Sequence, residues 1–377
     1  MGEPNETDAV PGEYVPYGAK PYFRPDPLPP DSGLAFDSEF YTTLSEATFW
    51  LGKLSGFAQT VDFAPVLYTS LLRKEAMESA EIEGAEVDYN ALYSHETRTG
   101  VQADAGSDGS AAATKDIQEV LNYENALEWG ISRIEDGAEI SVELLHSLHE
   151  RLLTGVPETR RETDTVGAFK TKPNHIGEFL PPVPGTVDGL IDALLTYIQT
   201  GGQYHPLIDI ALVHYQFETI HPYGDGNGRL GRLLITLQLY RQDYLDTPTL
   251  YLSEYFNRFK STYVDRLQGI RERGEWERWV TFFVRAVRHQ AEESVLRSTE
   301  LRELQHHYEA EYGGQARADA RLACLLFEQP YLTAALVEER LDVSGPTAYR
   351  AIDQLVADGL LEETTGNERN REYRARE

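Results

Sequence analysis

The segment from His221 to Arg232 reads HPYGDGNGRLGR and carries most of the recognisable chemistry of this chain. Gly224, Gly226 and Gly228 let the backbone turn successive N–H groups inward, which makes a cradle for anions. The apolar run that follows predicts a helix, and its N-terminus adds positive charge to the same cradle. The segment therefore predicts a phosphate-binding turn.

The side chains of this turn suit a reaction on a phosphate compound. His221 can take up a proton near neutral pH, and Asp225 offers the hard carboxylate oxygen that Mg²⁺ accepts. Asn227 can orient a phosphate, and Arg229 and Arg232 present forked donors on one helical face. This combination favours transfer of a phosphate-containing group from a nucleoside triphosphate to a hydroxyl. It is not a Walker loop, because no Lys-Ser/Thr pair follows its last glycine.

The segment resembles the signature of Fic domain proteins of the Fido superfamily, with Tyr223 where phenylalanine is usual. The resemblance implies a mainly α fold with a helical core and a β-hairpin flap. It also implies an enzyme that transfers AMP from ATP to a Ser, Thr or Tyr hydroxyl of a protein and releases pyrophosphate. By that likeness His221 deprotonates the hydroxyl, Asp225 holds Mg²⁺ and Arg232 binds the γ-phosphate. The other nucleotide-binding residues that it implies are Gly226, Asn227, Gly228, Arg229, Leu230 and Gly231.

Two flanking stretches extend the resemblance. In the stretch that begins at Tyr251, Tyr263 is a candidate contact for the base or ribose, with core packing of an amphipathic helix as the alternative. Upstream, GAFKTKPNHIGEFLPPVP from Gly167 resembles the flap that docks the target protein. The flap residues that match the pattern are Asn174, Ile176 and Gly177, together with Lys170, which stands where arginine is usual.

A second motif lies far upstream, in LLRKEAMESAEIEGAEV from Leu71. Ser79 and Glu83 are four residues apart, hence on one helical face. The pattern resembles the Fic inhibitory motif, which implies that Glu83 pairs with Arg232 and excludes the γ-phosphate. An ordinary acidic helix is the alternative. The same residues also leave open the reverse reaction, in which Glu83 helps to remove AMP from a modified protein.

The C-terminal segment resembles a winged helix-turn-helix. A helix beginning at Pro346 would offer Thr347, Tyr349 and Arg350 to DNA. From Ala318 onward, however, seven arginines stand against twelve acidic residues. DNA contact and a structural or dimerising role are therefore alternatives, and a nucleotide-sensing DNA-binding regulator is the alternative to an enzyme.

These motifs divide the chain into four parts. We expect an extended, proline-rich arm over residues 1–35, a helical region with the inhibitory motif over 36–130, the Fic domain over 139–290 and the winged-helix domain over 316–377. The small-residue stretch between Gly100 and Thr114 predicts a flexible loop. The single cysteine, Cys324, excludes an intramolecular disulfide.

Composition limits the partners and the setting. The net charge of −28 opposes nonspecific nucleic-acid binding, and the scarcity of lysine favours a halophilic protein adapted to high salt. No apolar run is long enough to cross a membrane, and the first residues lack the basic and apolar parts of a signal peptide, so a cytoplasmic location is expected. The sequence names no target protein and leaves a homodimer open.

Overall fold

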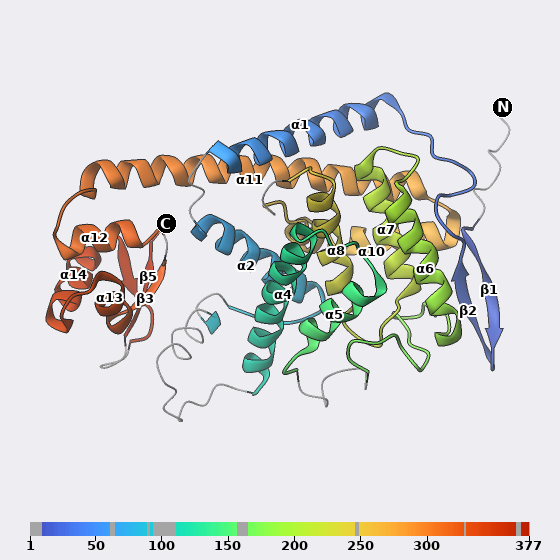
Figure 1. The fold of residues 1–377 in the computed structure, drawn as a ribbon, viewed down its shortest axis with the longest axis horizontal. Helices are drawn as coiled ribbons and strands as arrows, with labels where there is room; N and C mark the ends of the chain where they lie inside the picture. Colours follow the sequence, from blue (N-terminus) through green and yellow to red (C-terminus); the bar gives the residue numbers. More distant parts are fainter. Residues whose placement is uncertain are drawn as a thin grey trace. The chain divides into compact units, whose positions relative to one another are not determined.

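The computed structural model describes residues 10–60, 65–88, 91–92, 111–156, 165–245, 249–327, 329–366 and 371–376. Most of these residues are helical, so the mainly α fold that the sequence predicts is confirmed (Figure 1). The chain forms two compact units. The first takes the described parts of Met1–Gln59, Leu71–Ala85 and Gln118–Ser294, and the second takes those of Thr60–Ser70, Glu86–Ile117 and Val295–Glu377.

Part of the predicted N-terminal arm is a hairpin. Strands β1 (Gly12–Tyr17) and β2 (Lys20–Pro25) pair antiparallel, with Gly12 opposite Pro25 and Tyr17 opposite Lys20. The strands fold back on each other because Phe23 is fully buried and its N–H donates to the carbonyl of Leu180 at 2.9 Å. Alternation of polar and apolar residues in a proline-rich stretch was too weak a signal to reveal this packing.

Helices α7 (Pro206–Ile220) and α8 (Asn227–Arg241) form the centre of the first unit. Every residue of α7 from Leu207 to Ile220 is buried, which is why its sequence is apolar without a strong polar face. Helices α5 (Val142–Leu153) and α6 (Pro184–Thr200) pack against α8 and α7, respectively. The signature segment is the short connection between α7 and α8, so two buried helices fix both of its ends.

The remaining helices of the first unit surround this pair. The Trp279 indole N–H donates to the carbonyl of Ala211 at 2.8 Å and so joins α11 to α7. Helix α4 starts at Ala111, inside the stretch predicted as a loop, whereas the rest of that loop lies outside the described residues. These elements are α1 (Ser38–Thr60), α2 (Pro65–Ile82), α4 (Ala111–Glu135), α9 (Ser253–Arg258), α10 (Lys260–Arg273) and α11 (Trp276–Tyr312). Bounds of the two units fall within α1, α2, α4 and α11.

The C-terminal part of the second unit has its own apolar core, which includes Leu322, Val337, Ile352 and Tyr373. Its three strands form an antiparallel sheet in the order β3-β5-β4. The elements follow one another as α12 (Ala318–Leu325), β3 (Tyr331–Thr333), α13 (Ala334–Leu341), α14 (Gly345–Ala357), β4 (Leu361–Glu363) and β5 (Glu372–Ala375). Within the described residues, no helix is long and apolar enough to cross a membrane.

Candidate active site

The signature loop is held by its own side chains. His221 ends α7 in the left-handed conformation, with φ 49°, and its N–H donates to the carbonyl of Phe217 at 2.9 Å. Gly226, with φ 74°, lets the chain turn into α8. Asn227 closes the loop, because its Oδ1 accepts from the Tyr223 N–H at 2.8 Å and its Nδ2 donates to the Tyr223 carbonyl at 2.9 Å. The sequence predicts that Asn227 orients a phosphate. In the structure its buried amide instead binds the backbone of Tyr223 and so shapes the cradle.

The two signature arginines have different surroundings. Arg229 was predicted to grip a phosphate, but its Nη1 lies 3.2 Å from Glu119 Oε2 on α4 and its Nη2 lies 3.6 Å from Asp225 Oδ1. Only 4% of the Arg229 side chain is exposed. The guanidinium therefore braces the loop against α4, and no motif in the sequence indicates Glu119 as its partner.

Asp225 is the residue that fits a magnesium ion. Its Oδ1 accepts from the Gly226 N–H at 2.6 Å, and 22% of its side chain remains exposed. No group of three or more His, Cys, Asp or Glu side chains in the described residues could hold a metal. A single accessible carboxylate suits Mg²⁺, which keeps waters and takes its other oxygens from phosphates.

The structure brings the upstream motif to Arg232. The Arg232 side chain is only 2% exposed, and its Nη2 lies 2.8 Å from Glu83 Oε1. Its Nε donates to Ser79 Oγ at 2.8 Å, and its Nη2 also donates to the Ser79 carbonyl at 2.9 Å. The contacts with α2 thus occupy both the Nε and the Nη2 donors of this guanidinium.

The Glu83 carboxylate also lies against the anion cradle. A Cβ atom placed on Gly228, in the first turn of α8, would come within 2.2 Å of Glu83 Oε1. Burial raises the pKa of Glu83, but the charge of Arg232 and its hydrogen bond outweigh that effect and leave the pKa lowered. Glu83 is therefore an anion at neutral pH, at the helix N-terminus where a phosphate would be favoured.

Helix α2 is anchored next to this contact. The buried carboxyl of Glu75 accepts from Ser253 Oγ at 2.6 Å, from the Ser253 N–H at 2.9 Å and from Tyr123 OH at 3.0 Å. One turn further on, Asn257 Nδ2 donates to both Glu78 and Glu81. These bonds tie α2 to α4 and α9 and so place Ser79 and Glu83 above α8.

The imidazole of His221 lies in surroundings that keep it uncharged. Burial lowers the pKa of its imidazole to about 3, the Lys170 ammonium acts in the same direction, and Glu83 opposes it. The imidazole is therefore neutral at pH 7, which is the form that a general base requires.

The predicted flap divides into an inner and an outer part. Lys170 and Asn174 point inward and bind the backbone of the signature loop, and burial removes Lys170 from the expected docking surface, whereas Asn174 stays partly exposed. Ile176 and Gly177 lie further out, where the backbone forms one antiparallel bridge between Ile176 and Phe179 in place of two regular strands.

Tyr263, the predicted nucleotide contact, lies in the core. Its side chain is 4% exposed and stacks on Phe256, with ring centroids 4.7 Å apart. Its hydroxyl lies 2.8 Å from His214 Nε2. The face of α10 that carries Tyr263 is turned toward α9 and α11. These contacts favour the alternative interpretation of Tyr263, as a residue that packs α10 into the core.

Two histidines on α5 were missed by the sequence reasoning. The Gly167 N–H donates to His149 Nδ1 at 3.0 Å, so His149 Nε2 carries the proton and donates to the Asp225 carbonyl, also at 3.0 Å. The His149 ring stacks on Tyr223, and His146 Nδ1 lies 2.9 Å from the Tyr223 hydroxyl. The spacing of the two histidines, one helical turn apart, was the available signal.

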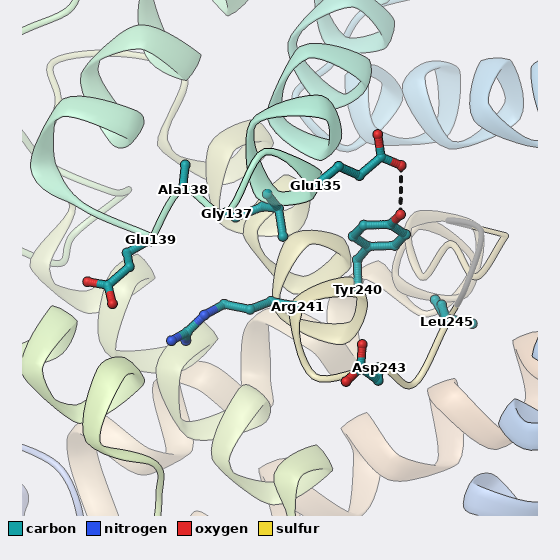
Figure 2. Close-up of a pocket in the computed structure, with 9 residues that line it drawn as sticks. Glu135, Gly137, Ala138, Glu139, Tyr240, Arg241, Asp243 and Leu245 are labelled. Atoms are coloured by element: carbon teal, nitrogen blue, oxygen red, sulfur yellow. Dashed lines mark hydrogen bonds between the residues drawn. The ribbon is translucent and has the colours of Figure 1, made fainter.

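A hollow of about 470 Å³ lies at the other end of α8 (Figure 2). Tyr240, Arg241 and Asp243 line it, and the Tyr240 hydroxyl donates to Glu135 Oε1 at 2.7 Å. None of its lining residues belongs to the signature, so it is separate from the site described above.

The sequence of this chain is similar to family models and to curated proteins that carry the Fic name. Residues 41–132 match the Fic/DOC family N-terminal model and residues 139–239 match the Fic/DOC family model. Protein adenylyltransferase Fic of Drosophila willistoni is 26% identical over 192 residues, which cover 50% of this chain and 37% of that protein. The Drosophila melanogaster protein of the same name matches at 26% identity over 38% of its length. The chain thus spans just over a third of these curated relatives.

Solved structures share the fold. A Fic family protein from Desulfovibrio desulfuricans G20 superposes with a TM-score of 0.58 at 21% identity, over 91% of this chain and 97% of that one. A Fic domain-containing signalling protein from Bacteroides thetaiotaomicron gives 0.54 at 18% identity, over 68% of this chain and 97% of its own. Since the two family models together match residues 41–132 and 139–239, which include the signature loop and the Ser79–Glu83 motif, this chain belongs to the Fic/DOC family.

Proposed function

We propose that this protein is an adenylyltransferase that transfers AMP from ATP to a hydroxyl side chain of another protein, and that Glu83 holds it inactive. The observation that carries the proposal is the Glu83 carboxylate, 2.8 Å from Arg232 and against Gly228. An anion occupies both the guanidinium and the cradle that a triphosphate tail would need. The 41% exposure of the Glu83 side chain makes this plug displaceable.

The residues suit an in-line transfer once Glu83 is displaced. His221 takes the proton of the incoming Ser, Thr or Tyr hydroxyl, and the freed oxygen attacks the α-phosphorus. A new O–P bond forms, the bond from the α-phosphorus to the pyrophosphate breaks, and the pyrophosphate leaves with the electron pair. The N–H groups at the start of α8 hold the phosphates, and Arg232 binds the γ-phosphate. Mg²⁺ bound at Asp225 would neutralise phosphate charge.

The direct test is transfer of label from ATP labelled at the α-phosphate, with Mg²⁺ and a lysate as source of targets. Wild type should transfer little, Glu83→Gly at least tenfold more, and Glu83→Gly/His221→Ala none above background. A control with ATP labelled at the γ-phosphate should leave no protein-bound label. Absence of transfer by Glu83→Gly to itself or to any lysate protein would refute the proposal.

The reverse reaction would use the same residues. If Glu83 orients water, wild type should remove AMP from a protein that Glu83→Gly has modified, and Glu83→Gly itself should not. Removal at equal rates by both forms would leave Glu83 as an inhibitor alone.

We further propose that residues 316–377 form a winged helix-turn-helix module. The order α12, β3, α13, α14, β4, β5 supports this, since two helices precede a hairpin of β4 and β5. Arg374 of β5 and Arg376, which follows it, both pair with Glu362, which favours a role other than DNA binding. A mobility-shift assay with the protein's own promoter at low salt tests this, and a sequence-specific shift would restore the regulator as a function.

A further inference from the structure

Lys170 is buried beneath the catalytic end of α7. Only 4% of the residue is exposed, and its Nζ donates to the His221 carbonyl at 2.8 Å, to Asn174 Oδ1 at 2.8 Å and to the Ile220 carbonyl at 3.3 Å. Its own N–H donates to the Pro222 carbonyl at 2.9 Å. Three consecutive carbonyls, of residues 220–222, are thus bound by one lysine.

This lysine binds a backbone that needs support. His221 has φ 49° and ψ 59°, a left-handed conformation that is unfavourable for a residue with a Cβ atom. Asn174 adds a second support, because its Nδ2 donates to the Tyr223 carbonyl at 2.8 Å and lies 3.4 Å from the His221 carbonyl. An ammonium group also complements the negative end of a helix. The direction in which the His221 ring leaves the backbone therefore depends on these contacts.

The same ammonium acts on the charge of the imidazole. The charged groups that face His221 are Lys170 from the flap, Arg271 from α10 and Glu83 from the end of α2. Burial lowers the pKa of His221 most, the two cations lower it further, and Glu83 raises it. Burial also lowers the pKa of Lys170, to about 7, so this group can lose its charge where an arginine at this position could not.

We propose that Lys170 is a positioning residue, which holds the backbone of Ile220 and His221 so that the imidazole keeps the orientation needed for transfer, and whose ammonium disfavours protonation of that ring. This inference rests on the proposed function and replaces target docking as the role of Lys170. Asn174 acts with it through the Tyr223 carbonyl.

The first test compares kcat and KM for ATP in the Glu83→Gly background. Lys170→Met should lower kcat about 100-fold, because a displaced base loses its near-attack geometry, while KM for ATP changes less than about threefold. Lys170→Arg keeps a buried cation with several donors and should recover kcat to within about tenfold of the parent. The matched control is Lys172→Met, since Lys172 is exposed two residues away. Equal kcat values for the Lys170→Met and Lys172→Met variants would overturn the proposal.

The second test does not need activity. The titration of the His221 ring is followed by NMR of protein labelled at histidine, with His221→Ala to assign the signal. Removing the Lys170 charge in Lys170→Met should raise the pKa of His221, so that the imidazole becomes protonated at a higher pH and the acid limb of the rate profile moves upward. An unchanged His221 titration in folded Lys170→Met would contradict the inference.

These readouts separate the two proposals. If Glu83→Gly transfers no AMP, the proposed function fails, whereas the NMR titration still decides the role of Lys170. If Lys170→Met does not give a cooperative thermal transition, Lys170→Gln, which retains an amide donor, is measured in its place against the same criteria.

Discussion

Single residues at this site form hydrogen bonds and ion pairs with residues of other elements. Arg232 binds the end of α2, Arg229 binds Glu119 of α4, and Tyr223 contacts α5. Tyr223 explains one departure from the family signature, because its hydroxyl has a partner in His146 Nδ1 where a phenylalanine would have none.

The contribution of the Tyr223 hydroxyl to the free energy of unfolding can be measured with Tyr223→Phe. The variant keeps the ring stacked on His149 and loses one hydrogen bond to a partly exposed histidine, so the free energy of unfolding should fall by about 1 kcal/mol. Urea denaturation checks the value. AMP transfer in the Glu83→Gly background should change less than about threefold, and a loss comparable to that of His221→Ala would show that the hydroxyl acts in the chemistry.

At the scale of elements, the proposed inhibition depends on the contacts that Ser79 of α2 and the adjoining Glu83 make with Arg232 of α8. Helix α2 holds Arg232 with a hydroxyl, a carbonyl and a carboxylate, and only the carboxylate competes directly with phosphate. The other contacts orient the guanidinium. Inhibition should therefore weaken in steps as these contacts are removed.

Ser79→Ala tests whether inhibition weakens in steps. The variant loses the 2.8 Å bond from Arg232 Nε but keeps Glu83, so its rate of AMP transfer should lie between those of wild type and Glu83→Gly. Initial rates of label transfer at one ATP concentration give the comparison. A rate for Ser79→Ala equal to that of wild type would mean that the hydroxyl does not contribute to inhibition.

The packing of α7 against α8 makes a second prediction at this scale. A Cβ atom on Gly231 would lie 2.3 Å from Glu218 Oε1 and 3.3 Å from Phe217 Cδ1. Gly231→Ala should therefore lower the free energy of unfolding by about 1–3 kcal/mol. The control is Gly189→Ala in α6, where no atom lies within 4 Å of the new methyl group and helix propensity favours alanine. If Gly231→Ala proves as stable as this control, α7 and α8 are less closely packed than described.

At the scale of the whole molecule, charge is the dominant feature. The net charge of −28 is spread over a chain with 34 basic and 62 acidic residues, so self-repulsion opposes the folded state at low ionic strength. We propose on this basis that the protein is halophilic. The acidic residues that anchor α2, which include Glu75, Glu78 and Glu81, accept hydrogen bonds from the uncharged donors Ser253 and Asn257.

Thermal unfolding in KCl tests the halophilic proposal. Because the Debye length falls from about 10 Å at 0.1 M to about 3 Å at 1 M, the Tm should rise by several degrees between 0.1 and 2 M KCl. Differential scanning calorimetry at constant pH provides the measurement, with sucrose at matched viscosity as the control for effects other than screening. A Tm that stays constant or falls over this range would argue against adaptation to high salt.

The sequence by itself determined the chemistry of the loop and indicated the family, because glycine spacing, a helix start and a short motif are local properties. It implied the pairing of Glu83 with Arg232 only through the resemblance to that family, and the structure then brought the two residues together. The sequence could not assign the partners of Arg229, Lys170 and Tyr263. Those depend on groups far along the chain, such as Glu119 on α4 or the carbonyls at the end of α7.

Only the tertiary structure decided which donors remain for a substrate. In a buried site each polar group must find a partner, and the partner is whichever element the packing brings within hydrogen-bond distance. The N-terminal hairpin and the two histidines of α5 became visible for the same reason: burial against the flap and the loop gives them their roles, and burial is a property of the folded chain as a whole.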